Sequence, residues 1–233
     1  GMKLRSIACF LCGTEMGVFV PKGSGLKTPK DLEGKKVIYT ASSLEGPFMK
    51  AFFEAGKAEV RKVQLINVDF AAKQPAYIAG QGDALVTSIP FMSNVMEKAK
   101  PSDTIMFADY GLVLPSLGYI ALEDTIRRKG PTLGAFVTVM SRAWHEVLDG
   151  GAREEAIAAI LKARPQSKLD AEYLRGQIEA YRPYFHTPNT KGRPHGWQPP
   201  QDWAQSIASQ KKVGLIPESM RPEEFYTNEF FAG

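Results

Sequence analysis

The chain has 233 residues, of which 44% are hydrophobic and 23% are charged, and this composition excludes disordered and fibrous proteins. Its net charge of +4 comes from lysines and arginines that are scattered among glutamates. Nucleic-acid binding requires a clustered basic face, so no nucleic-acid partner is predicted. No apolar run reaches the length of a membrane span.

The first half of the chain alternates between predicted strands and predicted helices. Thr28 is expected to cap a one-turn helix that begins at Pro29, and Gly46 with Pro47 opens a longer helix. The predicted strands are residues 3–11, 17–21, 36–40, 63–70, 82–88, 104–111 and 117–122. Two further helices are expected, one from Gln74 and Pro75 to Gly80 or Gly82, and one from Ser88 to Lys98. This alternation of apolar strands and helices predicts an α/β lobe with a mainly parallel sheet covered on both faces.

The second half is predicted to be helical after Asp124. The expected helices are residues 132–148, 151–163, 169–185 and 201–214. This half contains almost no strand signal, although its helices carry an apolar stripe, for example at Trp144 and Val147. Such a stripe is not stable in water, so these helices need a partner to pack against.

The two cysteines, Cys9 and Cys12, form a C-x-x-C pair inside an apolar run. On a strand, residues three apart point to opposite faces, so we expect the two thiols to stay apart and to be buried and inert. His145, His186 and His195 are distant from this pair in sequence. No metal site and no cofactor is therefore predicted.

Two groups of segments carry a resemblance to a known family. The stretches "GSGLKTPKDLEGKKVIYTASS", "AGQGDALVTSIP" and "DYGLVLPSLGYIAL" resemble the second half of a type II solute-binding protein of the NMT1/THI5-like group, which is related to sulfonate and taurine binders. The tail segments "HGWQPPQDWAQSIASQKKVGLI" and "FYTNEFF" are similar to the C-terminus of that group.

The resemblance implies a type II periplasmic-binding-protein fold with one complete lobe. Residues 1–14 would form a hinge-like strand, residues 15–122 the complete α/β lobe 2, and residues 123–233 the helical segment and tail of lobe 1. Members of the group begin with a further βαβα segment, and the resemblance implies that the N-terminal part of the first lobe is lacking here.

The implied function is that of the substrate-binding component of an ABC importer. Such a protein binds its ligand in an interlobe cleft, outside the cytoplasmic membrane, and works with a membrane permease. The expected ligand is a small heterocycle such as a thiamine-precursor pyrimidine, and no enzyme activity is expected. The eukaryotic branch makes this pyrimidine with a cysteine cluster, but the matching residues 112–117 contain no cysteine. That enzyme remains an alternative, as do a binder of a sulfonate, nitrate or aromatic acid, and a homo-oligomeric half-protein that binds no ligand.

The fold implied by the resemblance places ligand-binding residues at the carboxyl ends of the lobe's parallel strands. The expected ligand-binding residues are Thr40, Ser42, Ser43, Glu45, Gly46, Ser88 and Tyr110. Ser42 and Ser43 offer hydroxyls, and the amides near Gly46 offer N–H donors. Ser88 either caps its helix or contacts ligand, and the Tyr110 ring either stacks on ligand or packs in the core. Glu45 is the residue that separates the ligands, because its carboxylate would accept from an aminopyrimidine but would repel an anion.

Overall fold

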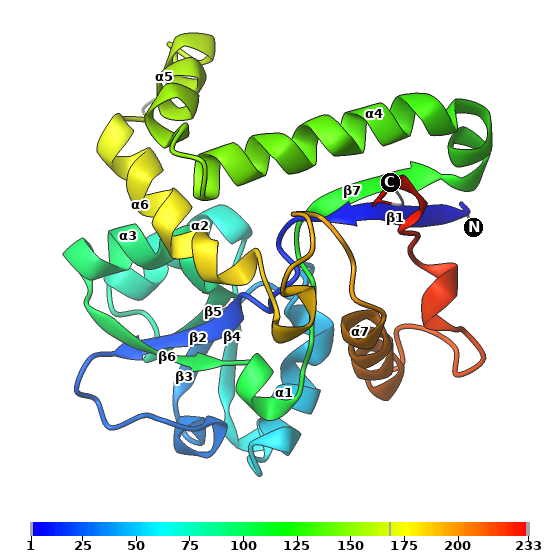
Figure 1. Cartoon of the computed structure of the whole chain (residues 1–233). Helices are drawn as coiled ribbons and strands as arrows, with labels where there is room; N and C mark the ends of the chain where they lie inside the picture. Colours follow the sequence, from blue (N-terminus) through cyan, green and yellow to red (C-terminus); the bar gives the residue numbers. More distant parts are fainter. Residues whose placement is uncertain (1, 168, 232–233) are drawn as a thin grey trace. The chain divides into compact units, whose positions relative to one another are not determined.

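The computed structural model describes residues 2–167 and 169–231 and contains two compact units (Figure 1). Unit 1 consists of the described parts of residues 1–13, 115–207 and 219–233, and unit 2 consists of residues 14–114 and 208–218. Among the described residues, every helix is too short or too polar to cross a lipid bilayer. The two units are described separately below.

Unit 2 is built on a five-stranded sheet with the strand order β4-β3-β5-β2-β6. Its strands are β2 (Met16–Pro21), β3 (Lys36–Tyr39), β4 (Gln64–Asn67), β5 (Ala84–Ser88) and β6 (Ser102–Met106). Strand β3 pairs in parallel with β4 and β5, whereas β2 pairs antiparallel with β5 and β6. The sheet is therefore mixed: four strands run in one direction and β2 runs against them.

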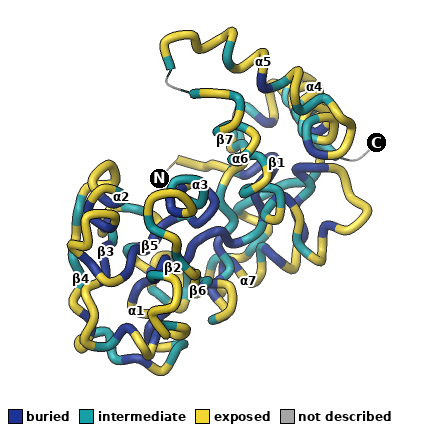
Figure 2. Tube along the Cα trace, turned by 90° about the vertical axis from the view of Figure 1, so that its left-hand side faces the viewer, coloured by how far each residue is buried: buried dark blue, intermediate teal, exposed yellow. Residues whose placement is uncertain are grey.

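Helices cover both faces of this sheet, as the sequence predicted. They are α1 (Met49–Ala55), α2 (Phe70–Ile78) and α3 (Ile89–Ala99). Neighbouring strand residues point to opposite faces. Val37 accordingly packs in the core cluster that contains Phe52 of α1, and Ile38 packs in the cluster that contains Tyr77 of α2. Figure 2 shows the inner strands β2, β3 and β5 as largely buried and the outer sides of the helices as exposed.

One helix of unit 2 begins earlier than expected. We predicted that Pro75 would open it, but α2 begins at Phe70, after Asp69, and Pro75 lies in its second turn. A proline there removes only one backbone hydrogen bond. Burial of Ala76 and Tyr77 against the sheet outweighs that loss.

The first segment of unit 2 begins and ends at neighbouring residues. The Leu114 amide donates a hydrogen bond to the Thr14 hydroxyl at 2.8 Å. The Val113 amide donates to Oγ of Ser209 at 3.2 Å, within the same unit.

The described part of unit 1 contains a two-stranded sheet and most of the α-helical residues. Strand β1 (Leu4–Cys9) pairs antiparallel with β7 (Gly118–Leu122). The helices are α4 (Glu123–Leu148), α5 (Arg153–Ala163), α6 (Ala171–Tyr181) and the first part of α7 (Pro200–Lys212). A core cluster that includes Ile7, Phe10 and Val137 joins β1 to the inner face of α4.

The boundaries of the units differ from the expected ones at β7. We expected residues 15–122 to form the α/β lobe, but the first segment of unit 2 ends at Leu114. Strand β7 pairs with β1 in unit 1 instead, where Leu4 faces Leu122. Residues 208–218 are an additional part of unit 2.

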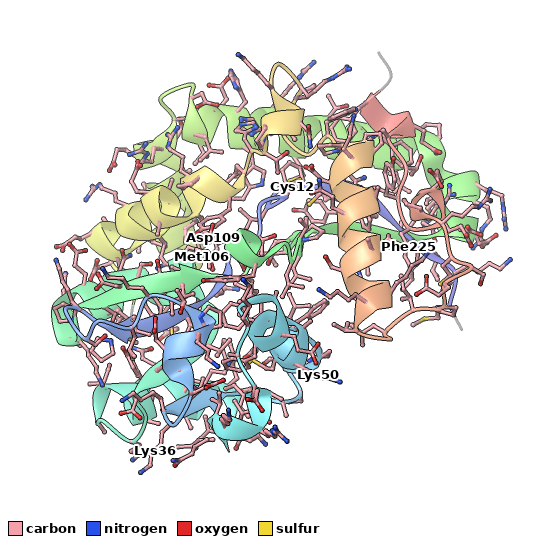
Figure 3. All side chains as sticks on the ribbon, turned by 90° about the horizontal axis from the view of Figure 1, so that it is seen from below. Cys12, Lys36, Lys50, Met106, Asp109 and Phe225 are labelled. Atoms are coloured by element: carbon pink, nitrogen blue, oxygen red, sulfur yellow. The ribbon has the colours of Figure 1, made fainter. Side chains whose placement is uncertain are left out.

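The prediction that the two thiols stay apart is wrong. Strand β1 ends at Cys9, so the alternation of a strand does not extend to Cys12. The Cys12 thiol, labelled in Figure 3, donates to the Cys9 carbonyl at 2.8 Å. A hydrogen bond with the Cys9 side chain, together with burial, raises the pKa of the Cys12 thiol. Cys12 therefore stays protonated, as a structural thiol does.

Candidate functional site

The candidate site lies at the edge of the unit 2 sheet where β3, β4 and β5 end. Tyr39 is paired with Asn67, and Ile38 is paired with Leu85, so the three parallel strands finish at the same edge. In open α/β sheets, ligands bind outside the carboxyl ends of the strands. Figure 3 labels Met106 at the end of β6 and Asp109 in the turn that follows.

The turn after β3 brings together five of the seven predicted residues. The buried Thr40 donates its hydroxyl to the Val68 carbonyl at 2.7 Å, so this hydroxyl serves the fold. Ser42 is exposed and Ser43 is half-buried, which leaves their side chains at the surface of the turn.

The amide of Gly46 is used inside this turn. It donates to the Ser43 carbonyl at 3.1 Å, so this amide is not a free donor in the turn. A Cβ atom at Gly46 would lie 2.1 Å from the Ala41 carbonyl oxygen. The turn is therefore too tight for any residue but glycine.

Glu45 points inward and forms an ion pair with Lys73 of α2. Glu45 is 2% exposed and Lys73 is 1% exposed. The same carboxylate oxygen lies 3.4 Å from the Thr40 amide. Glu45 therefore does not present a free carboxylate to a ligand, although we expected this carboxylate to separate an aminopyrimidine from an anion. A buried pair of this kind fixes the position of the turn, and it is costly to break because the remaining charge has no compensation.

Lys73 was missed in the sequence analysis. It lies in the apolar segment "FAAKQPAY", where a lysine at a helical position would ordinarily be solvent-exposed. A charged residue among apolar neighbours, in the helix that follows a strand, is the signal that could have indicated a buried ion pair.

The end of β5 carries hydroxyls that the fold leaves unused. Within residues 2–167 and 169–231, neither Oγ1 of Thr87 nor Oγ of Ser88 has a hydrogen-bond partner, and both atoms are buried. Ser88 is the N-cap residue of α3, but its side chain does not cap the helix. Thr87 is 1% exposed and was not among the predicted residues. Buried polar atoms are nearly always paired, so two adjacent exceptions indicate a functional role.

Tyr110 lies in the short 3-10 helix Ala108–Tyr110 after β6. Its ring packs edge-on against Phe52 with the ring centroids 5.4 Å apart. Burial and the charge of Asp109 raise the pKa of its hydroxyl. The structure thus places part of this ring against the core, with the residue half-buried.

The hollows on the surface of the described residues include two that lie elsewhere in the units. One, of about 270 Å³, lies in unit 2 and is lined by residues that include Lys22, Ser93 and Thr104. The other, of about 380 Å³, lies in unit 1 beside Arg5 and Arg127. Neither is lined by the turns described above.

Comparison with solved structures shows the fold of the chain. The periplasmic aliphatic sulphonate-binding protein SsuA from Escherichia coli matches with a TM-score of 0.69 and 18% identity, over 99% of this chain and 76% of that protein. The alkanesulfonate-binding protein SsuA from Xanthomonas axonopodis pv. citri matches with a TM-score of 0.66 and 16% identity, over 97% of this chain and 74% of that protein. The nitrate-binding protein NrtA from Synechocystis matches with a TM-score of 0.61 and 9% identity, over 98% of this chain and 66% of that protein. The chain has the α/β fold of periplasmic binding proteins.

Sequence comparison identifies the family. A Haemophilus influenzae protein named for thiamine biosynthesis is 27% identical over 146 residues, which are 61% of this chain. The chain matches 46% of the length of that relative, or about half. The family model described as "NMT1/THI5 like" matches residues 1–150, well over half of the chain. The protein therefore belongs to the NMT1/THI5-like family.

Proposed function

We propose that the protein is the substrate-binding component of an ABC importer and that it binds a small heterocycle such as a thiamine-precursor pyrimidine. The proposal is supported by membership of the NMT1/THI5-like family, by the name of the Haemophilus influenzae relative, and by a fold shared with periplasmic binding proteins. In this proposal the protein acts outside the cytoplasmic membrane and delivers its ligand to a membrane permease.

The observation that carries the proposal is the pair of unpartnered hydroxyls at the end of β5. Each hydroxyl of Thr87 and Ser88 can donate one hydrogen bond and accept others. An aminopyrimidine offers the complementary groups, because its ring nitrogens accept and its exocyclic amine donates. Neighbouring strand residues point to opposite faces, so a ring that supplies partners to both hydroxyls would lie across the end of β5.

The turn after β3 provides the second side of the proposed site. Ser42 and Ser43 present hydroxyls at its surface. The buried pair of Glu45 and Lys73 holds the turn from beneath, so Glu45 acts as a positioning residue. Ligand sites commonly combine a few polar groups with such a preformed support.

A second candidate ligand is a sulfonate or nitrate. Lys73 neutralises Glu45, so the repulsion that would have excluded an anion from this turn is removed. Hydroxyl groups can also donate to a sulfonate oxygen.

We propose binding without catalysis. Residues 112–117, where the eukaryotic branch carries its cysteine cluster, contain no cysteine. Cys9 and Cys12 are buried in unit 1 and not in the unit that carries the proposed site. Thiolate ligands for iron are therefore missing at that place.

Isothermal titration calorimetry tests the proposal. An aminopyrimidine thiamine precursor, an alkanesulfonate and nitrate are titrated separately into the full chain. The expected result is saturable binding of the aminopyrimidine that weakens by about tenfold or more in Ser88→Ala, since one lost hydrogen bond to a ligand is worth about 1.4 kcal/mol. Ser24→Ala is the matched control, because Ser24 is an exposed serine in the loop after β2, at the opposite edge of the same sheet.

The alternatives lead to different results. Binding of the sulfonate or nitrate alone would replace the pyrimidine by the second candidate. Equal ligand affinity of Ser88→Ala and of the unchanged chain would show that the β5 hydroxyls do not belong to the site. Absence of binding for all three ligands would refute both the pyrimidine and the second candidate.

A further inference from the structure

The three histidines of the chain lie together in unit 1, although they are far apart in sequence. His145 belongs to the last turn of α4, His186 follows the 3-10 helix Arg182–Tyr184, and His195 lies in the loop before α7. The ring of His195 is 6.0 Å from that of His145 and 4.5 Å from that of His186, measured between centroids. This cluster has no part in the candidate site of unit 2.

Asp149 lies between two of these rings. It is the C-cap residue of α4, one turn after His145, so both side chains leave the same face of the helix end. Its Oδ2 atom is 3.0 Å from Nε2 of His195 and 3.6 Å from Nδ1 of His145. One ligand atom from each of the three residues lies within 4.8 Å of the other two.

These distances match the ligand spacing of a mononuclear metal site. Zinc–nitrogen and zinc–oxygen bonds of about 2.1 Å, arranged tetrahedrally, place the ligand atoms about 3.4 Å from one another. The two distances to Asp149 lie on either side of this value. The side chain of His145 is 60% exposed and can rotate to close the third edge.

His195 is held in place by packing. It is 6% exposed, and its ring meets Phe185 edge-on with centroids 6.2 Å apart. Its Nδ1 atom is buried and has no hydrogen-bond partner in the described part of the chain, so the contact of Nε2 with Asp149 is the polar contact that orients the ring.

Arg182 occupies the other oxygen of the carboxylate. Its Nη1 atom lies 3.2 Å from Oδ1 of Asp149, which leaves Oδ2 directed at the histidines. Hydrogen-bonded partners of this kind commonly orient ligating side chains.

We propose that His145, Asp149 and His195 form a binding site for a divalent transition metal of the zinc class. Two imidazoles and one carboxylate suit Zn²⁺, Ni²⁺ or Cu²⁺, whereas Ca²⁺ and Mg²⁺ prefer oxygen ligands alone. Three protein ligands leave a fourth position for water or an external group. The metal would join the end of α4 to the loop before α7 within unit 1.

Titration of zinc chloride into metal-free protein without a polyhistidine tag tests this site. The expected result is one saturable site per chain and a melting temperature that rises with zinc. His145→Gln should bind at least about 100-fold more weakly, because hydrogen-bonded partners of ligands alone are worth about 10- to 100-fold. His186→Gln is the matched control, since it removes a neighbouring histidine that is not one of the three ligands, and its affinity should stay within about tenfold of the unchanged chain.

Several results would overturn the proposal. They are the absence of saturable zinc binding, equal zinc affinity in His145→Gln, and equal binding of Mg²⁺. Because His145 is exposed, its variant should melt as the unchanged chain does in the absence of metal. If it does not, Asp149→Asn provides the second test, and undiminished zinc binding by that variant would equally exclude the site.

Discussion

Replacing Thr87 by valine separates the stability of unit 2 from its proposed binding function. The Thr87 hydroxyl is buried and unpartnered, and an unsatisfied buried polar group costs about 1–3 kcal/mol. Valine has nearly the same shape and no hydroxyl. We therefore expect Thr87→Val to raise the free energy of unfolding by about 1 kcal/mol, which corresponds to a rise of about 2–4 °C in the melting temperature of a chain of this size.

The same change should weaken ligand binding. If the hydroxyl bonds the ligand, its loss should reduce affinity by about tenfold, or about 1.4 kcal/mol, in calorimetric titration. Thr104→Val is the matched control, because Thr104 is an exposed threonine on β6 of the same sheet and should change stability by less than about 0.5 kcal/mol. A fall in stability of more than about 1 kcal/mol for Thr87→Val would show that the hydroxyl is bonded in the folded protein, and would refute the reasoning.

Three further changes test other parts of the structure. Lys73→Met leaves Glu45 buried and unpaired, so urea denaturation should show a loss of about 3–5 kcal/mol, which the added change Glu45→Gln should partly restore. Gly46→Ala forces a Cβ atom against backbone and should lower the melting temperature, whereas Gly130→Ala, which has open space in α4, should not; equal effects would contradict the tight turn. The hydrogen bond from the Lys27 amide, with others from Thr28, lowers the pKa of Asp31 below its ordinary 3.8. Its stabilising effect is therefore present above that value and is lost as the pH falls through the folded pKa, so Asp31→Asn should destabilise the protein at neutral pH but not in acid; an equal loss at both pH values would contradict this assignment.

Local sequence signals were sufficient where the structure depends on neighbouring residues. Thr28, Pro29 and Asp31 form the capped 3-10 helix that was predicted, because a cap is set by residues three positions apart. The strands of unit 2 were also predicted, and the apolar runs of the inner strands β2, β3 and β5 are largely buried.

Features that depend on distant segments were not predicted. The apolar pattern of "LGYIAL" indicates a strand but not its partner, so the pairing of β7 with β1 could not be inferred. The burial of Lys73 depends on Glu45, which lies on a different element. Nothing in the local patterns around His145 and His195 indicates that the fold brings them together.

The contact between Leu114 and Thr14 has a consequence for the topology of unit 2. The first segment of unit 2, residues 14–114, has its two ends next to each other, because the Leu114 amide and the Thr14 hydroxyl form a hydrogen bond of 2.8 Å. Domains whose ends lie close together commonly tolerate circular permutation. A peptide link between these two positions, with new termini opened in the exposed loop at Gly23, should leave the strand order β4-β3-β5-β2-β6 unchanged. Chain continuity between β2 and β3 would then be dispensable for the architecture of the sheet.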